Sequence, residues 1–169
     1  MAQSIEQIEK KEIEREGKYL TFSLSNEEYG IGILKIKEII GMMAITPVPQ
    51  TPPFLKGVFN LRGKVIPVID LRLRFGMVPS EYSKRTCIIV VEIFTQNGVM
   101  LMGIIVDSVS EVLHIKKKDI EDTPLFSCTL NTDYILGMAK KDGGVKILLD
   151  IDRILSKEEI SRFSSGFMK

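Results

Sequence analysis

Several residue types on which catalytic and metal sites depend are scarce in this chain of 169 residues. It contains no tryptophan, one histidine (His114) and two cysteines (Cys87 and Cys128) that do not form a C-x-x-C pair. No Walker, HExxH, G-x-S-x-G or EF-hand pattern is present either. We therefore expect no enzymatic activity, no catalytic residue, no metal site and no cofactor. Both cysteines are expected to be buried thiols of a reducing compartment.

The chain also lacks an excess of charge of either sign and any long hydrophobic run. Lysine and arginine total 23 against 22 acidic residues, a net charge of +1, so no strong field attracts nucleic acid or anionic lipid. The lysines at 116–118 are balanced by three acidic residues within 119–122, and no aromatic residues lie among them to stack on bases. No segment reaches the length of a membrane span. We expect a cytoplasmic protein that contacts neither nucleic acid nor the membrane directly.

What the sequence does contain is a pattern of short strands behind a charged start. Residues 1–18 are rich in charge without the apolar core of a signal peptide, and we assign them to an N-terminal arm. Tyr19 to Leu24 and Tyr29 to Ile33 predict a hairpin around a polar turn. Isoleucines on one side of Leu34 to Ile40 predict one or two helical turns. The proline-rich link at 45–53 predicts extended surface chain, because proline lacks the N–H that a central strand needs.

A second hairpin follows, and the strand pattern then continues almost to the C-terminus. Leu55 to Leu61 and Lys64 to Asp70 flank Arg62-Gly63, a pair typical of a tight hairpin turn. Leu71 to Phe75 predicts a helical turn capped by Asp70. Further strands are predicted at Cys87–Phe94, Val99–Val106, Ser110–Ile115, Tyr134–Lys140 and Val145–Leu149. The sequence therefore predicts a mainly β fold with short helices.

The strand pattern repeats within the chain. Gly30 to Ile33 matches Gly103 to Val106 at an offset of 73 residues. Gly57 to Leu71 matches Gly137 to Ile151 at an offset of 80 residues. The larger second offset indicates an insertion in the second half of the chain, between residues 112 and 134.

The repeat predicts how the chain is divided. We expect one folded domain over 19–160, made of two related β-units at roughly 19–82 and 83–154. The repeat alone does not decide whether the two units exchange strands. Residues 155–169 form a C-terminal helix or tail. Units of this size are too small to be strongly stable alone, so we expect them to pack on one another. The groove between the units is then the natural site for a partner.

Three features need separate interpretation. Arg62 lies at a hairpin tip, where its guanidinium either binds a partner's carboxylate or carbonyls, or remains a solvated turn residue or an ion pair between the two units. Leu125-Phe126 in the insertion is either packed inward or exposed as an interface anchor. Asp150 and Asp152 resemble a carboxylate pair, but aspartate before a helical segment is more often a cap.

The string G-V-F-N-L-R-G-K-V-I-P-V-I-D-L over residues 57–71 closely resembles the CheW family of chemotaxis proteins. The segments 27–31, 39–41 and 103–107 add to this resemblance, which runs from about residue 19 to residue 160. It implies two SH3-like five-stranded β-barrel subdomains that share a hydrophobic core. Related domains occur in the chemotaxis kinase and in CheV proteins, but from the length of this sequence we expect no kinase or receiver domain.

The resemblance also implies a function and a set of partners. It implies a non-catalytic adaptor, monomeric in isolation, that couples methyl-accepting chemoreceptors to the regulatory domain of the histidine kinase CheA and is recruited to membrane-associated receptor arrays. The alternative is a small SH3-like or OB-like module that binds a ligand or RNA, which would need a basic, aromatic-lined strand face. The partner-binding residues implied by the resemblance are Ile33, Ile36, Glu38, Lys56, Gly57, Val58, Asn60, Arg62 and Phe126.

Overall fold

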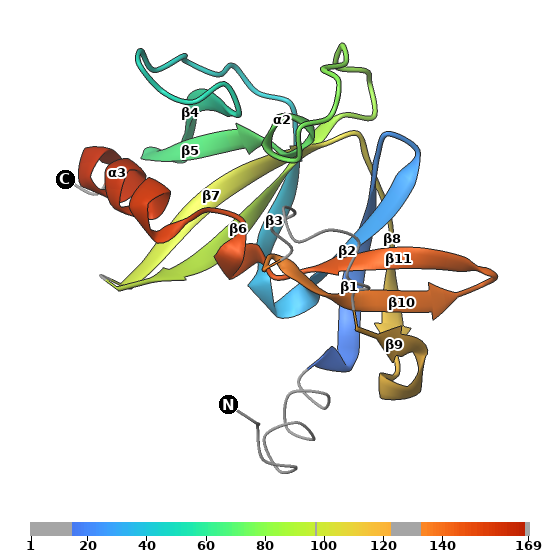
Figure 1. The fold of residues 1–169 in the computed structure, drawn as a ribbon. Helices are drawn as coiled ribbons and strands as arrows, with labels where there is room; N and C mark the ends of the chain where they lie inside the picture. The colour runs from blue at the N-terminus through green and yellow to red at the C-terminus, as the bar shows by residue number, and fades with distance from the viewer. Residues whose placement is uncertain (1–14, 97, 123–132, 168–169) are drawn as a thin grey trace.

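The structure, a computed structural model, describes residues 15–96, 98–122 and 133–167. Within these residues the strands form two sheets that lie beside each other (Figure 1). The six-stranded sheet has the order β8 (Ser108–Ile115), β1 (Gly17–Leu24), β2 (Glu27–Gly32), β11 (Gly144–Leu149), β10 (Ile135–Lys141) and β9 (Ile120–Glu121). The five-stranded sheet has the order β3 (Ile36–Gly41), β6 (Cys87–Thr95), β7 (Gly98–Val106), β5 (Lys64–Asp70) and β4 (Leu55–Leu61). The predicted mainly β class is confirmed, although the two-residue β9 gives one sheet a sixth strand.

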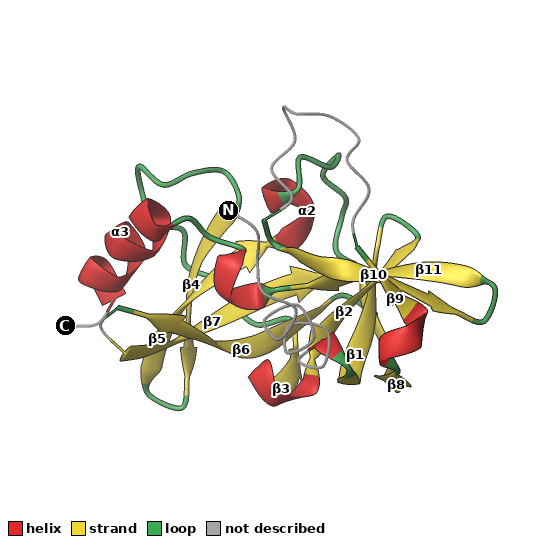
Figure 2. Ribbon diagram, turned by 60° about the horizontal axis from the view of Figure 1, so that its bottom comes forward, coloured by secondary structure: helices red, strands yellow, loops and turns green. Residues whose placement is uncertain are grey.

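The described helices are short; three lie between strands and two follow the last strand (Figure 2). They are η1 (Ile33–Lys35), α2 (Leu71–Arg74), η2 (Lys117–Asp119), η3 (Ile151–Arg153) and α3 (Lys157–Phe167). Asp70 caps α2 through Arg72 N–H, and Asp150 caps η3 through Asp152 N–H, so both aspartates serve as the caps expected from the sequence. No described helix has both the length and the apolar character that crossing a bilayer requires.

Three hairpins have two-residue turns whose backbone is left-handed at both central positions. These pairs are Ser25-Asn26, Arg62-Gly63 and Asp142-Gly143. Turns of this kind match the twist of the flanking strands, and asparagine, aspartate and glycine tolerate positive φ best. Local turn chemistry therefore explains why these predicted hairpins are confirmed.

The helical turns predicted at 34–40 are wrong beyond the short turn at 33–35. After η1 the chain forms β3, which pairs antiparallel with β6 through Ile39 opposite Ile89 and Ile40 opposite Ile88. The isoleucine spacing in so short a segment fits a helix or a strand equally well, and pairing with β6 decides in favour of the strand. Alternate residues of β3 are then more exposed and less exposed in turn, which is the period of a strand.

Neither sheet consists of the strands of one repeat alone. The six-stranded sheet joins β1 and β2 to β8–β11, and the five-stranded sheet joins β6 and β7 to β3–β5. In each sheet the repeats meet at one antiparallel pairing, of β1 with β8 or of β3 with β6, and at one parallel pairing. In the two parallel pairings, Gly30 lies opposite Leu148 and Val68 lies opposite Gly103. At the offsets of the repeat, these two pairings are equivalent. Each repeat therefore donates its first hairpin to the other, so the two units exchange strands as well as pack together.

The apolar interior explains why the exchange is stable. Residues of both sheets form the largest core cluster, which includes Phe22, Ile31 and Leu149 from one sheet and Ile69, Ile93 and Met102 from the other. Each sheet also has a small core of its own, around Phe59, Ile66 and Ile88 or around Tyr19, Ile115 and Leu148. The expected shared hydrophobic core is therefore confirmed, and separating the sheets would expose it to water.

Candidate functional site

The residues expected to bind partners lie mostly on the five-stranded sheet and on the segment that leads into it. Ile33 belongs to η1, Ile36 and Glu38 belong to β3, and Arg62 lies in the β4–β5 turn. The others are in β4: Lys56, Gly57, Val58 and Asn60. Phe126 and its neighbour Leu125 lie outside the described residues.

The β4–β5 turn and β3 are joined by an ion pair between Arg62 and Glu38. Asn60 Oδ1 accepts a hydrogen bond of 2.8 Å from Gly63 N–H and so shapes the turn that presents Arg62. Arg62 therefore forms an ion pair within one sheet rather than between the two units, and its binding to a partner stays a prediction. The Arg62 side chain remains 72% exposed, so this pair adds at most about 1 kcal/mol to stability and leaves the guanidinium accessible.

Two residues of β4 hold the proline-rich link in place. Thr46 and Val58 exchange two backbone hydrogen bonds, of 2.8 and 2.9 Å, beside Gly57. A Cβ at Gly57 would lie 2.1 Å from the Thr46 carbonyl oxygen, so a glycine is needed for this close approach. The link contains turns at 49–50 and 53–54, so the extended chain predicted for 45–53 is only partly confirmed. Gly57 and Val58 thus have a structural role at this position.

Lys56 lies near Tyr82, which bonds a buried carboxylate. The Lys56 ammonium is 6.0 Å from the centre of the Tyr82 ring, at the outer limit of a cation–π contact. Tyr82 donates a hydrogen bond of 2.8 Å to buried Asp70. Burial and the adjacent Asp70 carboxylate raise the pKa of Tyr82 far above its ordinary value, so the phenol stays protonated as a donor.

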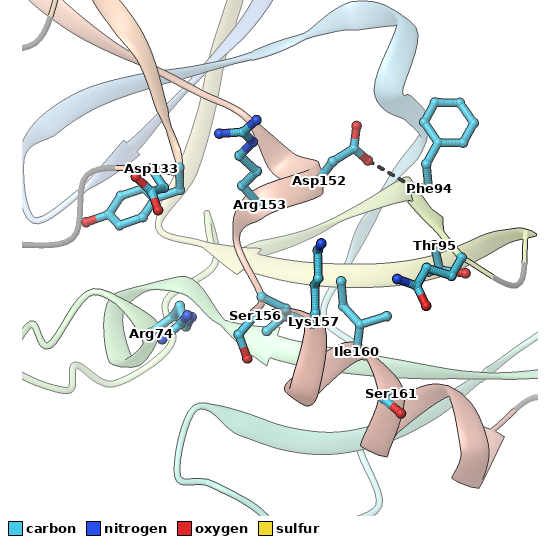
Figure 3. A pocket seen from close by; sticks show the side chains of 13 residues that line it. Arg74, Phe94, Thr95, Asp133, Asp152, Arg153, Ser156, Lys157, Ile160 and Ser161 are labelled. Carbon is cyan, nitrogen blue, oxygen red and sulfur yellow. Dashed lines mark hydrogen bonds between the residues drawn. The ribbon is translucent and has the colours of Figure 1, made fainter. Parts of the chain in front are cut away.

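Another polar contact lies just before β3, where the chain crosses from one sheet to the other. Lys35 donates a hydrogen bond of 2.9 Å to Asp152, and its ammonium is 3.9 Å from the centre of the Phe94 ring. Asp152 also accepts a hydrogen bond of 3.0 Å from Phe94 N–H, which Figure 3 shows. We call this contact of Lys35, Asp152 and Phe94 the Lys35 clasp.

An equivalent contact joins the sheets at the opposite crossing. Arg72 donates two hydrogen bonds to Asp107, of 2.7 and 2.6 Å, and Asp107 accepts another of 2.9 Å from Ser25 N–H. We call this contact of Arg72, Asp107 and Ser25 the Arg72 clasp. Burial alone would raise the pKa of Asp107, but the hydrogen bonds from Arg72 and Ser25 outweigh it and lower that pKa. Each clasp thus holds a carboxylate against a backbone N–H of the other sheet.

The groups considered for catalysis have ordinary structural roles. His114 is exposed on β8, and Asp150 and Asp152 act as a cap and an ion-pair partner. Burial, and then the charge of Asp152, raises the pKa of Asp150. In the part of the chain that the structure describes, no group of three or more histidine, cysteine, aspartate or glutamate side chains could hold a metal ion.

The cysteines are only partly described. Cys87 is a free thiol at the start of β6, and it is half-buried rather than fully buried as expected. Burial raises the pKa of the Cys87 thiol, which keeps it protonated and unreactive at neutral pH. Cys128 lies outside the described residues.

The structure adds residues that the sequence did not indicate. Leu34 at the centre of η1 is 93% exposed, and Phe94 on β6 is also largely exposed. Phe94 and Asp152 border a pocket of about 670 Å³ between η3, α3 and the end of β6 (Figure 3). The repeat offset of 80, which aligns Asp152 with Arg72, is the sequence signal that could have linked the two charged positions.

These features define a class of protein: a duplicated β protein with two sheets. Its candidate site consists of the edge strand β3 and of η1, the segment that crosses between the sheets. Comparison with known proteins is more specific. A sequence model of the CheW-like domain family matches residues 18–159. The Chemotaxis protein CheW of Klebsiella aerogenes is 43% identical over 143 residues, covering 85% of this chain and 84% of the relative. The Chemotaxis protein CheW of Helicobacter pylori is 35% identical over 140 residues, covering 83% and 82%.

A solved structure is similar as well. The crystal structure of the scaffolding protein TtCheW from Thermoanaerobacter tengcongensis matches with a TM-score of 0.75 and 39% identity, covering 85% of this chain and 97% of the other. The chain therefore belongs to the CheW family. Members of this family are non-catalytic scaffold proteins, which confirms the expectation that the chain is not an enzyme. The predicted fold of two SH3-like subdomains is confirmed by the same match.

Proposed function

We propose that this protein is an adaptor that couples methyl-accepting chemoreceptors to the regulatory domain of the histidine kinase CheA. It works by binding both partners at once, without chemistry of its own. Membership of a family of chemotaxis scaffold proteins supports this function. We further propose that the protein is cytoplasmic and monomeric in isolation, and that binding to receptors recruits it to membrane-associated arrays.

The observation that carries the proposal is the position of the Glu38–Arg62 ion pair. It joins β3 to the β4–β5 turn, and Glu38 is on the same strand as Ile36 and close in sequence to Ile33. Both isoleucines pack only partly against the shared core, and Leu34 between them is exposed. Apolar side chains next to a charged pair are the combination that an amphipathic helix or a second β-subdomain needs for specific binding.

We propose this surface as a partner site made of Ile33, Ile36, Glu38 and Arg62. Lys56, Gly57, Val58 and Asn60 would support it, because β4 carries the turn and holds the link. Phe126 is proposed as a second contact with the kinase, on the strength of the resemblance alone. We also propose the division of the chain given above: an arm at 1–18, a folded domain at 19–160 and a C-terminal helix or tail at 155–169.

Binding measurements with purified partners test the function. The full chain is titrated with a receptor tip fragment and, separately, with the CheA regulatory domain. Arg62→Ala should weaken binding to at least one partner by about tenfold or more, since a bidentate charged contact is lost. Its free energy of unfolding should stay within about 1 kcal/mol of the wild type, because the ion pair with Glu38 is exposed.

Lys64→Ala is the matched control, because Lys64 is an exposed cation of the same hairpin. It should leave both affinities within about twofold, as rim charges usually do. Failure of the wild-type chain to bind either partner at micromolar concentration would exclude the proposed function. Equal affinities for R62A and the wild type would instead show that Arg62 has only a structural role in the turn.

A further inference from the structure

The two clasps are equivalent under the internal repeat, but their charges are reversed. Each lies just beyond the carboxyl ends of the two parallel strands at the centre of one sheet: β2 and β11 for Lys35 and Asp152, β7 and β5 for Asp107 and Arg72. At the offset of 80 Asp152 corresponds to Arg72, and at the offset of 73 Asp107 corresponds to the residue before Lys35. The Asp152 carboxylate therefore occupies the position of the Arg72 cation, and the Asp107 carboxylate lies one residue from the position of the Lys35 cation.

Because of this reversal, the cation of only one clasp lies next to the proposed partner site. Lys35 is in η1, directly before Ile36 and two residues after Ile33. It is the residue at which the chain leaves the six-stranded sheet and enters β3 of the other sheet. The Arg72 clasp contains no residue of that site, so the two clasps differ in what they can influence.

We infer that Asp152 is a positioning residue for partner binding: through Lys35 and Phe94 it fixes η1, and so sets where Ile33 and Leu34 lie relative to Ile36 and Glu38. The inference rests on the proposed function of that surface. No residue of η1 is buried, and no side chain caps its start. Lys35 is the one polar side chain in this turn, so its contacts in the clasp add a polar restraint to the partial packing of Ile33 against the core.

The clasp is suited to this role because Asp152 is itself held in place. Its N–H donates a hydrogen bond of 3.2 Å to Asp150, and η3 is fixed by buried Ile151 and Ile154. The carboxylate accepts a hydrogen bond from Phe94 N–H of β6 and pairs with Lys35 from the crossing turn. Both bonds are charge-assisted and partly shielded from water, where such contacts are stronger than on an open surface.

Three single variants and one double variant test the inference on the full chain. Asp152→Asn and Lys35→Met each remove the ion pair, and each should weaken binding of the receptor tip or the CheA regulatory domain by on the order of tenfold, since η1 then samples other positions. Because both act through one contact, the double variant should bind as weakly as either single variant. Lys35→Arg keeps the charge and should bind within about threefold of the wild type.

A spectroscopic readout and a control separate positioning from general stability. The backbone amide resonance of Phe94 should shift in D152N, because its acceptor loses a charge. Asp107→Asn breaks the equivalent clasp and should lower the urea midpoint of unfolding while leaving both affinities within about twofold.

The outcomes distinguish the inference from the function on which it rests. Wild-type binding with unchanged affinity in D152N and K35M, despite a shifted Phe94 resonance, overturns the inference alone. So does an equal loss of binding in D107N, because the effect would then follow stability. A wild-type chain that binds neither partner overturns both.

Discussion

Replacing Gly57 with alanine tests how the proline-rich link is held to β4. The new Cβ would lie 2.1 Å from the Thr46 carbonyl oxygen and 2.7 Å from its carbon, and both are backbone atoms that a rotamer change does not move. Gly57 also has φ of +144°, a conformation that alanine rarely adopts. The link must therefore move away from β4.

The cost follows from the contacts that are lost. Thr46 and Val58 exchange two backbone hydrogen bonds, each contributing about 1 kcal/mol net. Backbone strain at position 57 adds about 1–3 kcal/mol. We expect Gly57→Ala to lower the free energy of unfolding by about 3–5 kcal/mol, a large share of the roughly 5–15 kcal/mol that holds a typical domain folded.

Urea denaturation followed by circular dichroism measures this change, and limited proteolysis at 42–54 reports whether the link detaches first. Gly41→Ala is the matched control, because a Cβ at Gly41 meets nothing within 4 Å. The control should stay within about 1 kcal/mol of the wild type. A loss below about 1 kcal/mol for G57A, with the link still protected, would refute the reasoning.

The repeat and the Arg72 clasp give two further predictions. Gly103→Ala should lower the free energy of unfolding in urea by about 1–3 kcal/mol, and by more than Gly30→Ala does. A Cβ at Gly103 would lie 2.8, 3.0 and 3.1 Å from three core side chains, whereas a Cβ at Gly30 would have one contact of 3.0 Å and longer ones otherwise. Equal costs would contradict this. The lowered pKa of Asp107 stabilises the fold above its unfolded value of about 3.9, and this contribution is lost as pH falls through the lower folded value. Unfolding free energy should therefore fall less steeply below about pH 5 in Asp107→Asn than in the wild type, and identical pH profiles would show that the bonds from Arg72 do not matter.

The candidate site was only partly predictable. The turn that presents Arg62 follows from local sequence, because Asn60 and Gly63 supply the side-chain acceptor and the conformational freedom that it needs. The partner of Arg62 was not predictable, since Glu38 lies on a strand that the isoleucine pattern had assigned to a helix. Lys35 and Asp152 are far apart in the sequence, and each alone resembles an ordinary surface charge.

The mainly β class, the hairpins and the duplication all follow from the sequence, because turn residues act locally and a repeat is visible without coordinates. How the two repeats combine depends on tertiary contacts instead. At Gly30 and at Gly103, the absence of a Cβ allows a parallel strand to pack closely against the glycine. In both cases that parallel strand belongs to the other repeat. Local propensity is the same whether a hairpin packs with its own repeat or with the other one. The exchanged arrangement is stabilised by burying one apolar core that both sheets share, and this long-range contribution is absent from local propensity.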